Sequence, residues 1–210
     1  MPLFRLLACM VLLGGALSGG GCVSTSSTPE VQLLVKSPLP PICRIAVLPF
    51  VNHTDYDRGD LLVYRIFVAE LNRRQGFTVV QEGDVRRIYR QMQLTPKESP
   101  GYEQTLVLAD RLGVDALISG EIVAMHDEQR MKETEPVLAV DMKLLPAGAT
   151  KPWLTSYHRR TGAEYRKVMH FGLVNTMTSL ATVVSGEIVD AWLAKGLTPC
   201  GDNKKLGIRN

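Results

Sequence analysis

The first 22 residues constrain this chain most, because they predict which compartment it reaches and how much of it is left to fold. Arg5 supplies a short basic start, residues 6–17 form a nearly uninterrupted apolar run, and small residues precede Cys22. This is the layout of a bacterial secretory signal. The apolar run is shorter than the roughly 20 residues that a helix needs to cross a bilayer. We therefore expect export and no retained transmembrane helix.

Cys22 resembles the cysteine of a lipobox, where a signal peptidase cuts before the cysteine and its thiol carries a diacylglycerol. Gly19 stands where the usual pattern has leucine, so a soluble secretory cut after Ser18 remains an alternative. Val23 replaces the aspartate that in many bacteria retains lipoproteins at the inner membrane. We expect a palmitate-bearing anchor on the periplasmic side of the outer membrane, where several acyl chains hold durably.

Domain boundaries follow from this start. Residues 1–21 are predicted to be the signal peptide and residues 22–41 a flexible tether, because Ser/Thr-rich segments have too little apolar surface to order themselves. Residues 42–200 suffice for one well-packed domain, and residues 201–210 form a C-terminal tail. The net charge of +3 comes from dispersed basic residues, so no nucleic-acid partner is expected.

The cysteines agree with export. Cys9 leaves with the signal and Cys22 would be lipidated, which leaves Cys43 and Cys200 as a pair in an oxidising compartment. We predict a disulfide between them that fastens the end of the chain to the sheet; two separate thiols are the alternative. No CxxC or Cys/His spacing suits a metal, so no metal site and no cofactor are expected.

Apolar runs and helical periodicity alternate along residues 42–200, which favours a single α/β domain. Its mixed β-sheet should have a parallel core and an antiparallel meander, covered by helices that include a long C-terminal one. Expected strands are 44–50, 77–80, 114–124, 137–145 and 153–160. Expected helices are 61–75, 84–92, 102–112 and 162–195, and an interruption of the last helix at Gly172 or Gly186 is left open. The segment 125–135 is expected to be a charged hairpin connection.

The helix predicted over 162–195 carries apolar residues at three- and four-residue spacing, which predicts a stripe that packs on the sheet. The stripe consists of Val168, Phe171, Val174, Met177, Ala181, Val184, Ile188 and Trp192. The opposite face carries Asn175, Thr178, Thr182, Ser185 and Glu187. This face lacks the Lys and Arg that membrane-lying helices favour, so core packing is the preferred interpretation.

Motifs for catalysis are not found where they would be needed. The first strand lacks the glycine-rich turn of nucleotide folds, and the sequence contains neither a Gly-x-Ser-x-Gly elbow nor a His-Glu-x-x-His pair. We therefore expect a binding protein and no enzyme. The alternative is a periplasmic hydrolase or ligand-processing enzyme that uses His53, Asp55 and Asp57, which follow the first strand closely.

The remaining histidines have mainly structural interpretations. His126 sits in the charged hairpin, where we expect it to be solvated, and His158 belongs to a strand that looks exposed. His170 opens the final helix, where a structural hydrogen bond is favoured over catalysis.

The helix at 61–75 is apolar on more than one face, so part of it is predicted to contact a partner or a second copy of the chain. The residues proposed for this contact are Leu61, Tyr64, Phe67 and Val68.

Three segments of the sequence resemble segments of a known protein family. Arg44–Thr54 (RIAVLPFVNHT) resembles the opening strand and loop of envelope lipoproteins of the curli-secretion (CsgG) and TolB amino-terminal-domain type. Gly76–Gln81 and Ala109–Gly120 are similar to that family's second strand and helix-to-strand passage. The resemblance covers residues 42–125 well and the remainder in outline.

The resemblance implies an accessory or scaffolding lipoprotein of transport, secretion or cell-wall machinery, lipid-anchored in the envelope. It implies an unknown envelope protein partner and allows a homo-oligomer. One member type forms a secretion channel, so a pore subunit is a second alternative. Such channels need long amphipathic hairpins. The short, charged segment 125–135 makes that alternative the less favoured one.

Overall fold

The computed structural model describes residues 29–35, 38–74, 76–130, 133–149, 151–166 and 172–200. Its sheet elements are β1 (Glu30–Leu33), β2 (Arg44–Val47), β3 (Val51–Asn52), β4 (Thr78–Val79), β5 (Ala116–Arg130), β6 (Glu133–Pro146) and β7 (Leu154–Thr161). Its helices are α2 (Gly59–Arg73), α3 (Glu82–Gln91), α4 (Tyr102–Leu112), the 3-10 turn η1 (Gly162–Tyr165) and α5 (Met177–Ala194). No helix in these ranges combines the length and the apolar character needed to cross a membrane.

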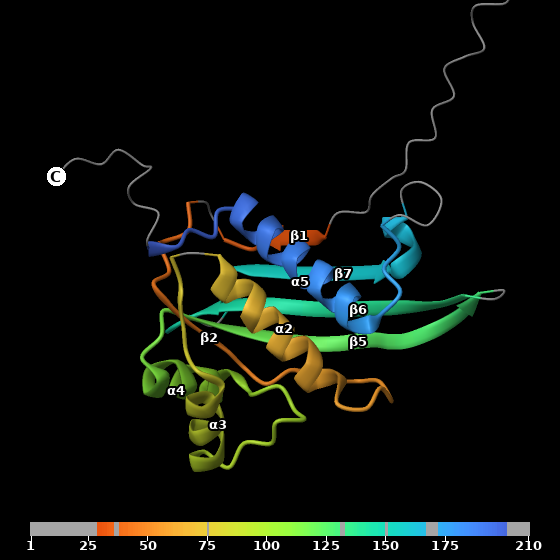
Figure 1. Cartoon of the computed structure of the whole chain (residues 1–210). Helices are drawn as coiled ribbons and strands as arrows, with labels where there is room; N and C mark the ends of the chain where they lie inside the picture. Colours follow the sequence, from red (N-terminus) through yellow and green to blue (C-terminus); the bar gives the residue numbers. More distant parts are fainter. Residues whose placement is uncertain are drawn as a thin grey trace, which may run out of the picture.

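All strands belong to one mixed sheet in the order β1-β7-β6-β5-β2-β4, with β3 pairing beside β5 (Figure 1). β2, β3 and β4 make the parallel pairs, and the long β5, β6 and β7 form an antiparallel meander with β1 at its edge. This confirms the predicted α/β class, with its parallel core, antiparallel meander and C-terminal helix.

Helices cover the sheet on both faces. α2 and α5 lie side by side on one face (Figure 1) and bury the larger core, where Phe67 and Trp192 meet at a centroid distance of 6.3 Å. α3 and α4 cover only the parallel end of the other face, with Leu48 and Leu108 among their buried contacts. In the described part of the chain no helix covers the rest of the meander on that face, where Asp141, Lys143 and Arg159 are at least partly exposed.

One glycine lets the larger core close. A Cβ at Gly120 on β5 would lie 2.7 Å from the ring of Phe50, which is closer than carbon atoms pack. Phe50 also contacts the rings of Tyr64 and Phe67 on α2, each at a centroid distance of 5.9 Å. The missing side chain therefore allows the aromatic cluster under α2 to reach the sheet.

The predicted tether is wrong over residues 30–33, which form edge strand β1. Glu30 pairs with Tyr157 and Leu33 with Leu154 on β7. Val31 and Leu33 pack on the core while Glu30 and Gln32 are exposed, which is the period-two alternation of a half-buried strand.

The two strands that meet in segment 125–135 are longer than predicted. β5 continues to Arg130, β6 begins at Glu133, and the ladder runs without a break from Met125↔Leu138 to Arg130↔Glu133. The backbone ladder holds this extension, in which His126, Asp127 and Gln129 are exposed.

The C-terminal helix begins at Met177 and not at Gly162. A Cβ at Gly162 would lie 1.8 Å from the carbonyl oxygen of Val174, so the chain folds back on itself where the helix was expected. Thr176 then caps α5 by accepting a hydrogen bond from the Ser179 amide at 3.2 Å. Met177, Ala181, Val184, Ile188 and Trp192 are buried as predicted, whereas Val168 and Phe171 lie outside the described residues.

The end of the domain is fastened beside β2. Cys43 and Cys200 are joined by a disulfide with their Cα atoms 4.7 Å apart. The amide of Ile42 donates to the Thr198 carbonyl at 2.9 Å, and the amide of Cys200 donates back to the Ile42 carbonyl at 3.1 Å. The chain that follows α5 thus returns to the strand at the centre of the parallel pairs.

Candidate functional site

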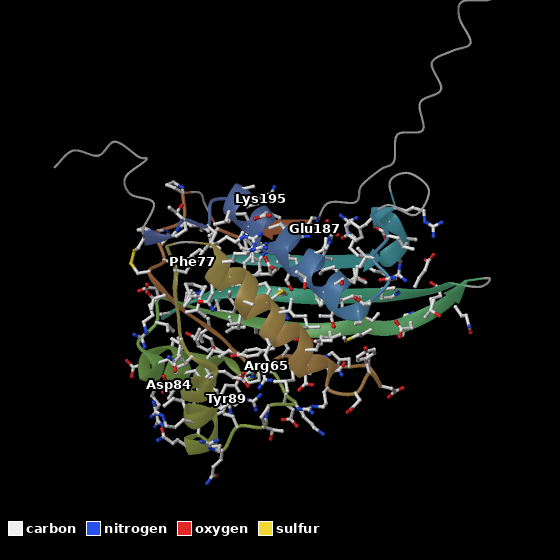
Figure 2. The ribbon with its side chains drawn as sticks, viewed as in Figure 1. Arg65, Phe77, Asp84, Tyr89, Glu187 and Lys195 are labelled. Atoms are coloured by element: carbon white, nitrogen blue, oxygen red, sulfur yellow. A yellow bond between two sulfur atoms is a disulfide. The ribbon has the colours of Figure 1, made fainter. Side chains whose placement is uncertain are left out.

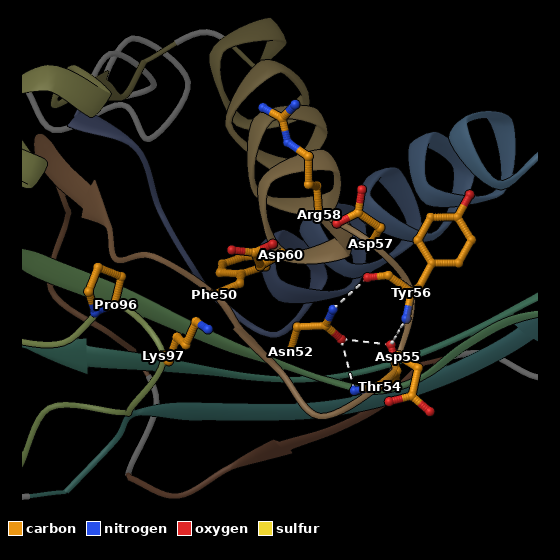
Figure 3. Close-up of a pocket in the computed structure, with 10 residues that line it drawn as sticks. All are labelled: Phe50, Asn52, Thr54, Asp55, Tyr56, Asp57, Arg58, Asp60, Pro96 and Lys97. Carbon is orange, nitrogen blue, oxygen red and sulfur yellow. Dashed lines mark hydrogen bonds between the residues drawn. The ribbon is translucent and has the colours of Figure 1, made fainter.

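The loop after β3 is organised by Asn52. Its side-chain amide donates to the Tyr56 carbonyl at 2.9 Å, and its oxygen accepts from the Thr54 amide at 3.0 Å and the Thr54 hydroxyl at 2.7 Å. These bonds shape one side of an open pocket of about 430 Å³, and Pro96 and Lys97 lie on its other side (Figure 3).

The predicted trio His53, Asp55 and Asp57 is not assembled. Asp55 and Asp57 both line this pocket, but His53 does not. His53 lies with its Nε2 atom 3.1 Å from Glu121 Oε2 on β5. Among the described residues no group of three or more His, Cys, Asp or Glu side chains is placed to hold a metal ion.

Glu121 on β5 is contacted by three side chains, those of His53, Ser99 and Lys143. Burial would raise the pKa of Glu121, but the hydrogen bond from His53, the charge of Lys143 and the hydrogen bond from Ser99 together hold it below its usual value. Glu121 is therefore an ion-pairing carboxylate, and this environment does not prepare it to act as an acid near neutral pH.

The predicted partner contact on α2 is wrong for two of its four residues. Tyr64 and Phe67 are 4% and 0% exposed, because they belong to the stripe that α2 buries against the sheet. Burial, reinforced by the charge of Glu82, raises the pKa of Tyr64 to about 12. Leu61 and Val68 are half-buried. Tyr64 and Phe67 therefore belong to the core, although the sequence pattern had suggested that they contact a partner.

A second apolar stripe remains on the outer side of α2. We call it the α2 surface; it is a shallow groove of about 400 Å³ lined by Arg58, Leu61, Leu62, Arg65, Ile66 and Ala69. Arg65 and Ala69 are exposed, and the three aliphatic residues are half-buried. The spacing from Leu62 to Ile66 to Ala69 is the signal in the sequence that could have identified this stripe.

A buried charged cluster lies between β7 and α5, and no local pattern in the sequence indicates it. His158 and Arg160 are each 2% exposed and point from β7 toward Glu187 on α5, which Figure 2 labels. His158 Nε2 lies 2.5 Å from Glu187 Oε2, and Arg160 Nε donates to the same oxygen at 3.0 Å. The expectation that His158 lies on an exposed strand is therefore wrong.

Two further groups, Tyr165 and Glu164, belong to this Glu187 cluster. The Tyr165 hydroxyl donates to Glu187 at 3.1 Å, and Arg160 also donates to Glu164 at 2.9 Å. Burial would raise the pKa of Glu187, but hydrogen bonds from His158 and Arg160 hold it below its usual value. The cluster is an internally compensated network, which is how buried charges are stabilised.

Three other residues carry predictions from the sequence. His126 is exposed and borders a shallow surface depression beside the loop after β3, as expected for a solvated residue. His170 and the predicted lipidation site Cys22 lie outside the described residues.

Comparisons with known proteins add a fold relationship. The sequence matches no protein-family model and no curated protein. PelC from Paraburkholderia phytofirmans, solved as a dodecamer, is similar with a TM-score of 0.55 at 16% identity, covering 81% of this chain and 99% of that chain. Lipoprotein GNA1162 from Neisseria meningitidis has a TM-score of 0.50 at 14% identity, covering 72% and 99%.

At these identities the likeness establishes the fold alone. The chain has the α/β fold that is also found in a bacterial lipoprotein and in PelC. The more specific resemblance to the CsgG and TolB type stays a prediction.

Proposed function

We propose that this chain is a lipid-anchored assembly protein of the bacterial cell envelope, without catalytic activity, that acts on the periplasmic side of the outer membrane. Its α2 surface binds a second copy of the chain. The observation that carries the proposal is this apolar stripe, which remains on α2 after the helix has buried Tyr64 and Phe67. The secretory signal and Cys22 support the location.

A second copy is the occupant that we favour. PelC, which shares the fold over 99% of its chain, is a dodecamer. The α2 surface combines half-buried Leu62 and Ile66 with arginines at its border. Apolar centres with arginine at the margin are typical of protein interfaces, where lysine and acidic residues are depleted. The finer role, as an accessory subunit of the CsgG and TolB type serving transport, secretion or cell-wall machinery, belongs to the same proposal.

The anchor is tested with a palmitate analogue in cells that express the chain. We expect label on the wild-type protein in the membrane fraction and none on the Cys22→Ala variant. An unlabelled wild-type protein recovered from the soluble periplasm would contradict the location.

The assembly is tested on the full chain purified in detergent, with its mass measured by light scattering. Ala69→Glu places a charge on an exposed position of the α2 surface and should shift the protein toward the monomer. Val107→Glu is the matched control, because Val107 is 41% exposed on α4, away from α2. Thermal melting checks that both variants fold. A monomeric wild-type protein, or an assembly unaffected by Ala69→Glu, would overturn self-association through α2.

A further inference from the structure

The pairing of β1 with β7 shortens the link between the lipid and the domain. Seven residues, 23–29, separate Cys22 from Glu30. At no more than about 3.6 Å per residue, the eight steps from Cys22 to Glu30 span at most about 29 Å. A tether that ended at Ile42, as the sequence suggests, would reach about 72 Å on the same basis.

Glu30 is a fixed point on the domain. It pairs with Tyr157 in the ladder, and the next residue along, Val31, packs against the core. Leu34 extends the attachment by donating its amide to the Trp153 carbonyl at 2.9 Å. The anchor therefore acts on one edge of a rigid sheet.

This reach limits which side of the domain can face the bilayer. From β1 to β4 the sheet has five strand spacings of about 4.8 Å, or about 24 Å. If the β4 edge faced the lipid, the chain would have to cover that width, the edge side chains and a headgroup layer of about 6 Å. The total exceeds 29 Å, so β4 and the α3–α4 layer beside it must lie away from the membrane.

The residues at the β1 edge suit a headgroup surface. Five large hydrophobic residues are exposed in the described part of the chain, and two of them, Leu34 at 49% and Tyr157 at 41%, lie at this edge. Arg159 is also exposed, two residues along β7 from Tyr157 and on the same side of the strand. Tyrosine favours the membrane–water interface, and the arginine fork matches phosphate. Two carboxylates lie nearby, and each has a polar or cationic neighbour. Glu30 accepts from Gln32 at 3.3 Å, and Asp141, which pairs with Tyr157 in the ladder, lies beside Lys143.

We propose that the β1 edge surface, formed by Gln32, Leu34, Tyr157 and Arg159, lies on the anionic phospholipid headgroups of the membrane that holds the Cys22 lipid. The inference rests on the anchor in the proposed function and adds an orientation and a lipid contact to it. In this orientation α5 lies nearer the bilayer than α2, because α5 packs on β6 and β7 while α2 packs on β3, β4 and β5. The α2 surface stays available to a neighbouring copy on the same membrane.

The test uses the full lipidated chain in vesicles of phosphatidylethanolamine and phosphatidylglycerol. A fluorophore is attached through Gln32→Cys on β1 or, as the control, through Val107→Cys on α4; both positions are exposed. Headgroup-labelled quencher lipid is then added. We expect the label at 32 to lose most of its fluorescence and the label at 107 to lose little. Adding Leu34→Glu and Arg159→Glu should remove much of the loss at 32.

The outcomes separate the two proposals. A chain that does not float with the vesicles overturns the anchor and this inference together. A chain that floats but is quenched equally at 32 and 107 overturns only the orientation. Quenching at 32 that persists in full after Leu34→Glu and Arg159→Glu overturns the headgroup contact, because the tether alone would then account for the proximity.

Discussion

The Glu187 cluster allows a quantitative prediction, because the single Glu187 carboxylate is hydrogen-bonded to His158 and Arg160 on β7 and to Tyr165 on η1. Glu187→Gln keeps the size of the side chain and removes its charge. Arg160, whose side chain is 3% exposed, would keep Glu164 as a partner, but the charge of Glu187 that compensates it would be gone. Breaking a buried pair from one side costs about 3–5 kcal/mol. Since Glu187 itself is 25% exposed and Glu164 remains, we expect a loss of about 2–4 kcal/mol.

That loss is large compared with a typical stability of about 5–15 kcal/mol. For a domain of this size it corresponds to a fall in melting temperature of roughly 5–15 °C. Urea unfolding and thermal melting measure both quantities. Asp190→Asn on the same helix is the control, because the Asp190 side chain is 66% exposed and its pair with Arg74 should contribute less than about 1 kcal/mol.

The pH dependence follows from the direction of the shift. Because the folded-state pKa of Glu187 is lowered, its stabilisation is fully present above the unfolded-state pKa of about 4.3 and is lost as pH falls through the folded value. The difference in stability between wild type and Glu187→Gln should therefore shrink as pH falls below about 4. Equal stability of Glu187→Gln and Asp190→Asn at pH 7 would refute the idea that the cluster is a stabilising buried network.

Two further predictions concern the core and the disulfide. Trp192→Ala should destabilise the domain by about 3–5 kcal/mol, because Trp192 is 0% exposed and packs on Phe67; an unchanged urea midpoint would contradict its place in the core. The Cys43–Cys200 bond spans 157 residues, so replacing both cysteines by serine should cost about 2–5 kcal/mol. Non-reducing mass mapping of periplasmic protein should find the linked peptides, and two free thiols after quenched extraction would refute the bond.

Much of the secondary structure could be predicted because its signals are local. The helix at 102–112 was predicted with the bounds that the structure has, since Gly113 at a φ of 61° provides the left-handed residue that ends a helix. The apolar run after Arg44 predicted a buried strand, and Ala46 and Val47 are 0% and 1% exposed. The stripe that ends at Trp192 predicted which face of the last helix is buried.

The candidate site was harder to predict, because several residues on one helix compete for a single buried face. Tyr64 and Phe67 looked available for a partner, yet they are the residues that α2 packs on Phe50. Only the position of the sheet decides which of two apolar stripes is buried. The stripe that remains, with Leu62 and Ile66, became the α2 surface.

The sequence by itself therefore determined the fold class and most of the helices and strands, since periodicity and capping depend on near neighbours. The address that the signal layout predicts belongs to the proposed function. The tertiary structure decided β1, because four residues form a strand only when β7 supplies hydrogen bonds and the core receives Val31 and Leu33. It also decided the burial of His158 and Arg160, since two charged groups can leave water only when Glu187, distant in sequence, is brought to meet them. Such contacts depend on how the elements pack, and packing has no local signature in the chain.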